Sequence, residues 1–249
     1  DDLKGAVEFD HVNFGYTPDK TVIRDFSARV EPGQMVAIVG PTGAGKTTMV
    51  KLLMRFYDVE AGAVLVEGRD VREYAPDALR HKVGLVPQKA ELFSGTIADN
   101  IRWGDPQADD QAVRDAAVMA QADEFIRRQK DGYQSLVERG GTNLSGGQKQ
   151  RLTIARALVR RPAILVLDDS SSALDYATDA ALRRAIREGT EGMTVFMVSQ
   201  RVSAVKQADL ILMLDDGELA GAGSHEELLA TCEAYREICE SQEKGGDGR

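Results

Sequence analysis

The sequence predicts an α/β fold in which helices cover a mostly parallel sheet. We also expect an N-terminal antiparallel β subdomain and a helical subdomain. Three observations support this class. Residues 35–39 are all apolar and lead through a glycine-rich turn into an amphipathic helix. Residues 7–30 alternate apolar and polar positions, as in a half-buried hairpin. After residue 144, helical and strand patterns alternate, which is typical of parallel sheets.

The composition is that of a folded domain. The 249 residues (27.1 kDa) are 43% apolar and 29% charged with 7 prolines, which excludes disordered, collagen-like and low-complexity classes. The 31 basic and 40 acidic residues give a net charge of −9, so binding to nucleic acid is disfavoured. The longest apolar runs are far shorter than the ~18–20 residues that span a bilayer. No signal peptide begins the chain, and we expect this fragment to be soluble.

Three strands and a helix are expected at the start of the chain. Residues 7–16 and 22–30 form an antiparallel hairpin in this interpretation, with a proline turn between them. Residues 35–39 are a buried strand. A helix is expected over residues 46–57, where one face would carry Val50, Leu53, Met54 and Tyr57.

The middle of the chain is expected to be helical. A short strand at residues 83–86 precedes helical patterns at residues 110–120 and 122–130. We therefore predict a helical subdomain over about residues 89–160.

Helices and strands then alternate to the end of the chain. Helices are expected over residues 148–160 and 175–188, with a short one reaching residue 206; the strands are expected at residues 163–167, 194–198 and 210–214. Ser224 and Glu227 form a capping box that begins a last helical region, and residues 244–249 are predicted to be a flexible tail.

Two cysteines, Cys232 and Cys239, stand seven residues apart near the end of the chain. They are too few for a disulfide framework, and no second pair accompanies them to hold zinc. We expect both to be reduced packing residues on one side of a helix.

A phosphate-binding loop follows the strand at residues 35–39. Residues 40–47 match the pattern G-x-x-x-x-G-K-[ST], between a hydrophobic strand and a helix as the pattern requires. The glycines let backbone N–H groups converge on phosphate oxygens, and Lys46 would reach the β- and γ-phosphates. Thr47 would coordinate Mg²⁺. The predicted nucleotide-binding residues here are Gly40, Pro41, Thr42, Gly43, Ala44, Gly45, Lys46, Thr47 and Thr48.

A carboxylate ends the apolar run at residues 164–167. Asp168 then lies at the tip of a buried strand, where we expect it to hold the Mg²⁺ shell beside the phosphate loop. An aspartate in this position is by itself more often a helix cap or turn residue. The phosphate loop earlier in the chain is what favours the metal site.

A second glycine-rich segment precedes Asp168. Leu144, Ser145, Gly146, Gly147 and Gln148 strongly resemble the signature sequence of ATP-binding-cassette (ABC) ATPases. Glycines at a helix start make a second anion-binding terminus, although a glycine-rich helix cap would look the same in isolation. The resemblance implies a P-loop NTPase core and a head-to-tail dimer in which each signature meets the other subunit's γ-phosphate.

The resemblance covers residues 1–243. It implies that Tyr16 stacks on adenine, that Gln88 touches Mg²⁺ and the attacking water, and that the loop ending at Asp175 crosses to the other site. Residues 91–97 and 138–141 are similar to the exporter branch, in which they meet intracellular loops of the transmembrane helices. The chain is therefore expected to be the C-terminal part of a longer membrane polypeptide, at the cytoplasmic face of the membrane.

Two positions depart from the family pattern. The residue after Asp168 is a glutamate in the family and is Asp169 here, and the switch histidine is replaced by Gln200. We predict a site kept for ATP binding and weakened for hydrolysis, with Asp169, Gln200, Gln88 and Lys46 as its catalytic residues. An intact signature beside a weakened site resembles one half of a heterodimeric exporter, and the partner would be a second ABC subunit.

Two other functions remain open from the sequence. A soluble ABC ATPase that acts on nucleic acid or ribosomes would be expected to show a basic face or a long insertion, and neither is visible. A non-hydrolytic nucleotide sensor is supported by Asp169 and Gln200. The transported substrate cannot be read from these residues.

Overall fold

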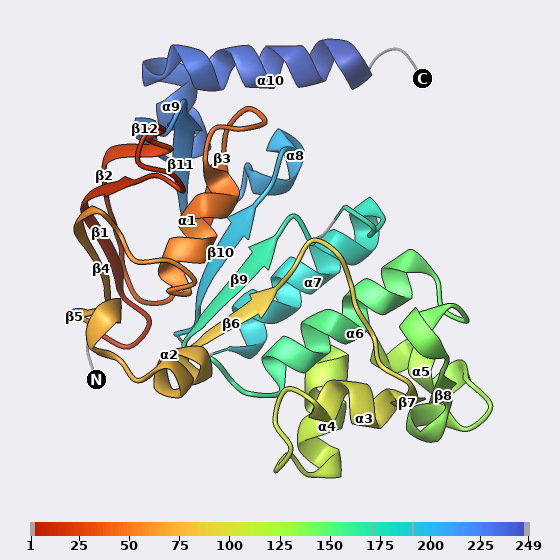
Figure 1. Cartoon of the computed structure of the whole chain (residues 1–249). Helices are drawn as coiled ribbons and strands as arrows, with labels where there is room; N and C mark the ends of the chain where they lie inside the picture. The colour runs from red at the N-terminus through yellow and green to blue at the C-terminus, as the bar shows by residue number, and fades with distance from the viewer. Residues whose placement is uncertain (1–2, 171, 191, 247–249) are drawn as a thin grey trace. The chain divides into compact units, whose positions relative to one another are not determined.

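The computed structural model describes residues 3–170, 172–190 and 192–246 (Figure 1). The chain divides into two compact units. One comprises residues 1–83 and 192–249, and the other comprises residues 84–191. The α/β fold predicted from the sequence is confirmed, and each unit is described by itself.

The first unit contains an antiparallel sheet in the order β2-β1-β4-β5. Its strands are β1 (Val7–Phe14), β2 (Ile23–Val30), β4 (Ala61–Val66) and β5 (Arg69–Asp70). The hairpin expected from the alternating pattern is β1 and β2, which pair antiparallel with Val7 opposite Val30. Its inward side chains are buried, including Phe9 and Phe26, whose rings meet edge to face.

A second sheet region of this unit carries the phosphate loop. The strands β12 (Glu218–Gly223), β11 (Leu210–Asp215), β3 (Met35–Val39) and β10 (Thr194–Val198) lie side by side in that order. β3 is parallel to both β10 and β11, whereas β12 is antiparallel to β11. Every residue of β3 and β10 is buried, as expected for strands with both faces covered.

Helices of the first unit lie between its strands along the chain or follow them (Figure 1). They are α1 (Lys46–Leu53), α2 (Pro76–Lys82), α8 (Val202–Val205), α9 (His225–Thr231) and α10 (Glu233–Gly246), with a 3₁₀ turn at Val71–Glu73. Ser224 and Glu227 form the predicted capping box at the start of α9. Helix α10 continues into the segment expected to be a tail, and residues 247–249 lie outside the described residues.

The second unit is mostly helical. Its helices are α3 (Ile97–Arg102), α4 (Asp110–Met119), α5 (Asp123–Arg128), α6 (Gly146–Leu158) and α7 (Tyr176–Gly189), with 3₁₀ turns at Gly132–Gln134 and Arg139–Gly141. Neighbouring strands β6 (Val83–Val86) and β9 (Ile164–Asp168) are accompanied by a small ribbon of β7 (Gly95–Thr96) and β8 (Leu136–Val137). α3 and α4 pack on α6, whose Leu152, Ile154 and Ala155 are fully buried.

The helix predicted over residues 46–57 ends four residues early, at Leu53. Arg55 adopts a left-handed conformation (φ 52°), and the N–H of Phe56 donates to the carbonyl of Lys51 at 2.8 Å. This is the Schellman ending, here with arginine in the place that glycine most often takes. Tyr57 therefore leaves the helix face, and its ring contacts Phe14 instead.

Other element boundaries differ by one to a few residues. The helix predicted at residues 148–160 begins at Gly146, because Ser145 is its cap. The cysteines do not share one helix, since Cys232 ends α9 in an extended conformation and Cys239 lies in α10. Both are buried free thiols, as expected for packing residues.

Candidate functional site

The phosphate loop connects β3 to α1 without a side-chain cap at the helix start. Gly45 occupies the cap position with φ 108°, and no carboxylate lies in the first turn of α1. The first N–H groups of a helix have no intrahelical acceptor and carry the positive end of the helix dipole. This helix start therefore has the donors and the field that an anion requires.

Two glycines of the loop are required by their surroundings. A Cβ on Gly40 would lie 2.2 Å from the carbonyl oxygen of Leu214, and a Cβ on Gly45 would lie 2.7 Å from Cδ1 of Ile23. The neighbour of Gly40 is backbone and cannot rotate away. The path of the loop therefore depends on packing against β11 and β2 as well as on its own torsion angles.

Lys46 is a buried cation held over the loop. The residue is 8% exposed, and its Nζ donates to the carbonyl oxygens of Gly40 (2.6 Å) and Pro41 (2.9 Å). Neutral carbonyls stabilise an ammonium group less than phosphate oxygens do. The lysine is thus placed where an anionic ligand could replace these two acceptors.

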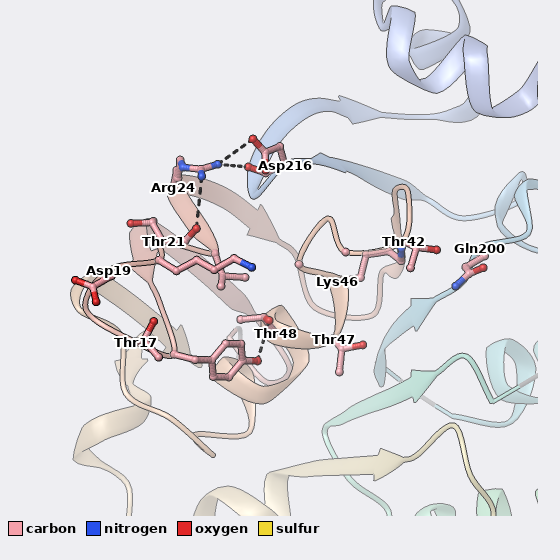
Figure 2. Close-up of a pocket in the computed structure, with 15 residues that line it drawn as sticks. Thr17, Asp19, Thr21, Arg24, Thr42, Lys46, Thr47, Thr48, Gln200 and Asp216 are labelled. Atoms are coloured by element: carbon pink, nitrogen blue, oxygen red, sulfur yellow. Dashed lines mark hydrogen bonds and ion pairs between the residues drawn. The ribbon is translucent and has the colours of Figure 1, made fainter.

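A pocket of about 800 Å³ opens beside the loop (Figure 2). Most of the predicted nucleotide-binding residues of this unit line it, namely Tyr16, Thr42, Gly43, Gly45, Lys46, Thr47 and Thr48, together with the predicted catalytic residue Gln200. Gly40 and Pro41 line an adjoining hollow of about 310 Å³, while Ala44 is buried. The structure therefore brings together residues that are separated by up to 184 positions in the sequence (16 to 200).

Tyr16 presents an oriented ring to this pocket. Its hydroxyl forms a hydrogen bond of 2.9 Å with Oγ1 of Thr48, and its ring meets those of Phe14 and Tyr57 edge to face, with centroids 4.9 and 5.1 Å away. The residue is 44% exposed, so its ring is accessible and is not part of the core. A fixed, accessible aromatic face is suited to stacking on a nucleobase.

Several residues at the outer end of the pocket are not predicted from the sequence. Arg24 forms an ion pair of 3.3 Å with Asp216 and also donates to the Asp216 carbonyl oxygen (Figure 2). The other residues there are Thr17, Asp19, Lys20, Thr21 and Val22. No motif contains Asp216, which comes to the pocket only because the turn after β11 reaches the start of β2.

In the second unit, three predicted catalytic and metal-binding residues lie at the end of β6 or β9 or within two residues after it. Asp168 ends β9, and Asp169 follows in a left-handed conformation (φ 47°) that aspartate tolerates better than most residues. Gln88 donates from Nε2 to Oδ2 of Asp169 at 3.3 Å. Eighty-one residues apart in sequence, these two side chains meet at one point of the second unit.

The signature segment forms the start of α6. Ser145 caps the helix by accepting from the N–H of Gln148 (3.2 Å), and Oε1 of Gln148 accepts from the N–H of Ser145 (3.0 Å). Leu144 is buried, and a Cβ on Gly147 would lie 3.2 Å from the carbonyl oxygen of Ala173. Since the Ser145 hydroxyl oxygen accepts here, its O–H can still donate to an anion.

Asp175 begins α7 as its cap. It accepts from the N–H of Thr178 (2.9 Å) and from the Thr178 hydroxyl (2.8 Å). These hydrogen bonds lower the pKa of Asp175, so its carboxylate stays ionised near neutral pH.

With both units described, comparison with known proteins decides the family. The profile of the ABC transporter family matches residues 23–172, more than half of the chain. The chain belongs to the ABC transporter family. It contains the P-loop ATPase domain of that family, in agreement with the sequence prediction.

Individual ABC proteins match almost the whole chain. It is 48% identical over 246 residues to an uncharacterized ABC transporter ATP-binding protein of Mycobacterium tuberculosis, covering 97% of this chain and 42% of that protein. It is 44% identical over 236 residues to the fatty acid ABC transporter ATP-binding/permease protein of the same species, covering 95% and 37%. A solved structure of a bacterial Atm1-family ABC exporter with ATP bound matches with a TM-score of 0.92 and 40% identity, covering 96% and 42%. The chain thus spans about two-fifths of the length of these relatives.

The second unit of this ABC domain has a groove of about 520 Å³ in which two aromatic residues are exposed. The rings of Phe93 and Trp103 lie 4.7 Å apart, and Trp103 is 65% exposed. Arg156 also lines this groove, where it donates to the carbonyl oxygens of Glu91 and Asn100 (both 2.9 Å) and lies over the Phe93 ring. Burial lowers the pKa of Arg156, but the guanidinium remains charged at neutral pH.

The donor chemistry of the predicted metal ligands fits Mg²⁺. Thr47, Gln88 and Asp168 offer a hydroxyl, an amide oxygen and a carboxylate, which are hard oxygen donors. No group of three or more His, Cys, Asp or Glu that could hold a metal ion occurs among the described residues. One carboxylate with nucleotide phosphates as further ligands is the usual arrangement for Mg²⁺ in such enzymes.

Within the described ranges, no helix has the length and apolar character needed to cross a membrane.

Proposed function

We propose that this chain is the ATP-binding and ATP-hydrolysing domain of an exporter, and that it powers movement of a substrate across a membrane. The observation that carries the proposal is the match, over 96% of the chain, to an exporter structure with ATP bound. Its relatives include an ATP-binding/permease protein, which supports a transmembrane partner segment on the same polypeptide. Residues 1–243 would act as the ATPase domain, with residues 89–160 as its helical subdomain.

The pocket of the first unit would bind Mg·ATP. Adenine would stack on Tyr16, whose ring is held in place by its bond to Thr48. The phosphate oxygens would accept hydrogen bonds from the N–H groups at the start of α1 and from the ammonium of Lys46, and the predicted loop residues would make further contacts. Mg²⁺, when bound by Thr47, Gln88 and Asp168, supplies positive charge that offsets the charge developing on the transferred phosphoryl group.

Hydrolysis at this site would be slow. A glutamate after Asp168 would reach about 1.5 Å further toward an attacking water, and positioned general bases typically contribute about 10²–10⁴ in rate. Asp169 instead accepts from Gln88, which supports a role for both residues near that water. Gln200 can donate a hydrogen bond to the γ-phosphate but cannot carry the charge of a histidine.

The signature would serve a partner's site. Ser145 caps α6 and Gly147 lies in its first turn. The Ser145 O–H can still donate, which suits this helix start to the γ-phosphate of a second ABC subunit in a head-to-tail dimer. An intact signature beside Asp169 and Gln200 supports a heterodimer in which the partner holds the stronger hydrolytic site. The groove with Phe93 and Trp103 would receive an intracellular loop of the transmembrane segment, at the cytoplasmic face of the membrane.

The asymmetry can be tested in the assembled transporter. The chain, with its membrane segment and its partner, is reconstituted as wild type, Ser145→Ala and Asp169→Asn, and ATPase turnover and transport are measured. Ser145→Ala should lower turnover by about 10²–10³, because it removes one positioned donor from the competent site. Asp169→Asn should have a much smaller effect.

Three outcomes would contradict parts of the proposal. If Asp169→Asn abolishes turnover as completely as Ser145→Ala, this site is not the weakened half. If no partner supports turnover although the chain binds Mg·ATP, the chain is a nucleotide sensor, the reading that Asp169 and Gln200 also support. Failure to bind Mg·ATP in a calorimetric titration would refute the function as a whole.

A further inference from the structure

Helix α8 lacks a cap of its own, and a side chain from α10 takes that place. Arg201, at the cap position of α8, forms no side-chain cap hydrogen bond. The first N–H of the helix, from the buried residue Val202, donates instead to Oε1 of Gln242 at 2.8 Å. Gln242 lies 40 residues further along the chain.

The same amide also holds the main chain of Gln200. Nε2 of Gln242 donates to the Gln200 carbonyl oxygen, so both ends of one amide group are bonded on either side of Arg201. On the other side of Gln200, Ser199 is tied to β3, since its N–H donates to the Ile38 carbonyl oxygen at 3.3 Å. The segment with Gln200 is therefore fastened at one end to the central strand and at the other to α10.

Helix α10 is itself firmly seated. Its buried residues Tyr235 and Cys239 and the residue Gln242 are spaced i, i+4 and i+7, which places all three on one face of the helix. The Tyr235 hydroxyl also bonds Nδ1 of His225 at 2.8 Å. α10 contacts α8 and β11 (Figure 1), so the Gln242 amide projects from a fixed support.

A hollow of about 310 Å³ is lined by residues of α10 and of the phosphate loop. It is lined by Gly40, Pro41, Thr42 and Gln200 and, from α10, by Glu237, Ile238, Ser241 and Gln242. Gln200 also lines the nucleotide pocket, where Figure 2 places it beside Thr42. Gln200 thus lines the pocket that would bind the nucleotide, and its carbonyl oxygen is bonded to α10.

We infer that Gln242 is a positioning residue that holds Gln200 toward the γ-phosphate, and that α10 thereby influences the discrimination between ATP and ADP. The inference rests on the proposed function, in which Gln200 contacts the γ-phosphate. Gln242 touches no nucleotide itself. It fixes the peptide from which the Gln200 side chain extends, because its amide bonds both the Gln200 carbonyl oxygen and the N–H of the buried residue Val202.

The test compares ATP and ADP binding in a double-mutant cycle. The 249-residue chain is prepared as wild type, Gln242→Ala, Gln200→Ala and the double variant, and the Kd for each nucleotide with Mg²⁺ is measured calorimetrically. Gln200→Ala should raise the Kd for ATP about tenfold and leave the Kd for ADP unchanged, as expected for loss of one hydrogen bond to a charged group. Gln242→Ala should raise the Kd for ATP about three- to tenfold and leave the Kd for ADP unchanged. In the Gln200→Ala background it should raise the Kd for ATP little further.

Matched variants separate positioning from general damage. Gln242→Glu keeps an acceptor for the Val202 N–H but loses the donor to the Gln200 carbonyl oxygen, so it should lose ATP selectivity like Gln242→Ala. Glu243→Gln, an exposed neighbour on α10, should behave as wild type.

Two results would overturn the inference while leaving nucleotide binding intact. One is that Gln242→Ala weakens the binding of ATP and ADP equally. The other is that Gln242→Ala weakens ATP binding as much in the Gln200→Ala background as in the wild type. If Gln200→Ala leaves the ratio of ATP to ADP affinity unchanged, the proposed contact of Gln200 fails and the inference fails with it. Absence of ATP binding by the wild-type chain would refute the proposed function itself.

Discussion

Replacing Lys46 with alanine should weaken ATP binding strongly while leaving adenosine binding nearly unchanged. Without ligand, Nζ donates to two neutral carbonyl oxygens, at 2.6 and 2.9 Å. Binding would exchange these bonds, about 1 kcal/mol each, for bonds to charged phosphate oxygens of about 1.5–3 kcal/mol each. The net difference is about 1–4 kcal/mol, and its midpoint of about 2.5 kcal/mol is ~70-fold in Kd. Because Lys46 is buried, solvent screens the interaction little.

Tyr16→Ala is the matched comparison for this prediction. It removes the stacking face, worth about 1–3 kcal/mol, and should weaken ATP and adenosine by the same factor. Calorimetric titration of both variants with both ligands separates the phosphate contribution from the base contribution. Wild-type ATP affinity in Lys46→Ala would refute the reasoning, as would equal losses of ATP and adenosine affinity in that variant.

Three further predictions concern the loop, the altered catalytic positions and a surface pair. Gly45→Ala should lower the melting temperature and ATP affinity, since φ 108° and a Cβ 2.7 Å from Ile23 Cδ1 impose strain of about 1–3 kcal/mol, measurable by thermal denaturation. Asp169→Glu combined with Gln200→His should raise dimer-dependent ATPase turnover more than the two single changes predict together; simple additivity in steady-state assays would show that the site is limited elsewhere. The hydrogen bond and charge of Asp25 raise the pKa of His11 above 6.5, so this pair stabilises the fold below that pH and the contribution is lost as the pH rises through the raised pKa. The difference in melting temperature between wild type and Asp25→Asn should therefore be larger at about pH 5.5 than at about pH 8.5.

Sequence alone was sufficient where the determinant is local. Residues 40–47 predict a strand–loop–helix anion site, because that spacing of glycines and lysine has few other uses, and the structure has this arrangement between β3 and α1. Capping pairs such as Ser224 with Glu227 are equally local, since both partners lie within one helical turn. Helix ends were less predictable, as the early end of α1 at Leu53 depends on the left-handed turn at Arg55.

Only the tertiary structure decided the contacts between residues that are distant in sequence. The ion pair of Arg24 with Asp216 and the bonds of Gln242 to the Gln200 segment follow from how β11 lies beside β3 and how α10 packs on α8 and β11. No short pattern contains such pairs, because they form only when burial of the strands and of the α10 face has set the register between separate segments. The family pattern thus predicts which residues lie around the nucleotide, whereas packing determines which other side chains hold them in position.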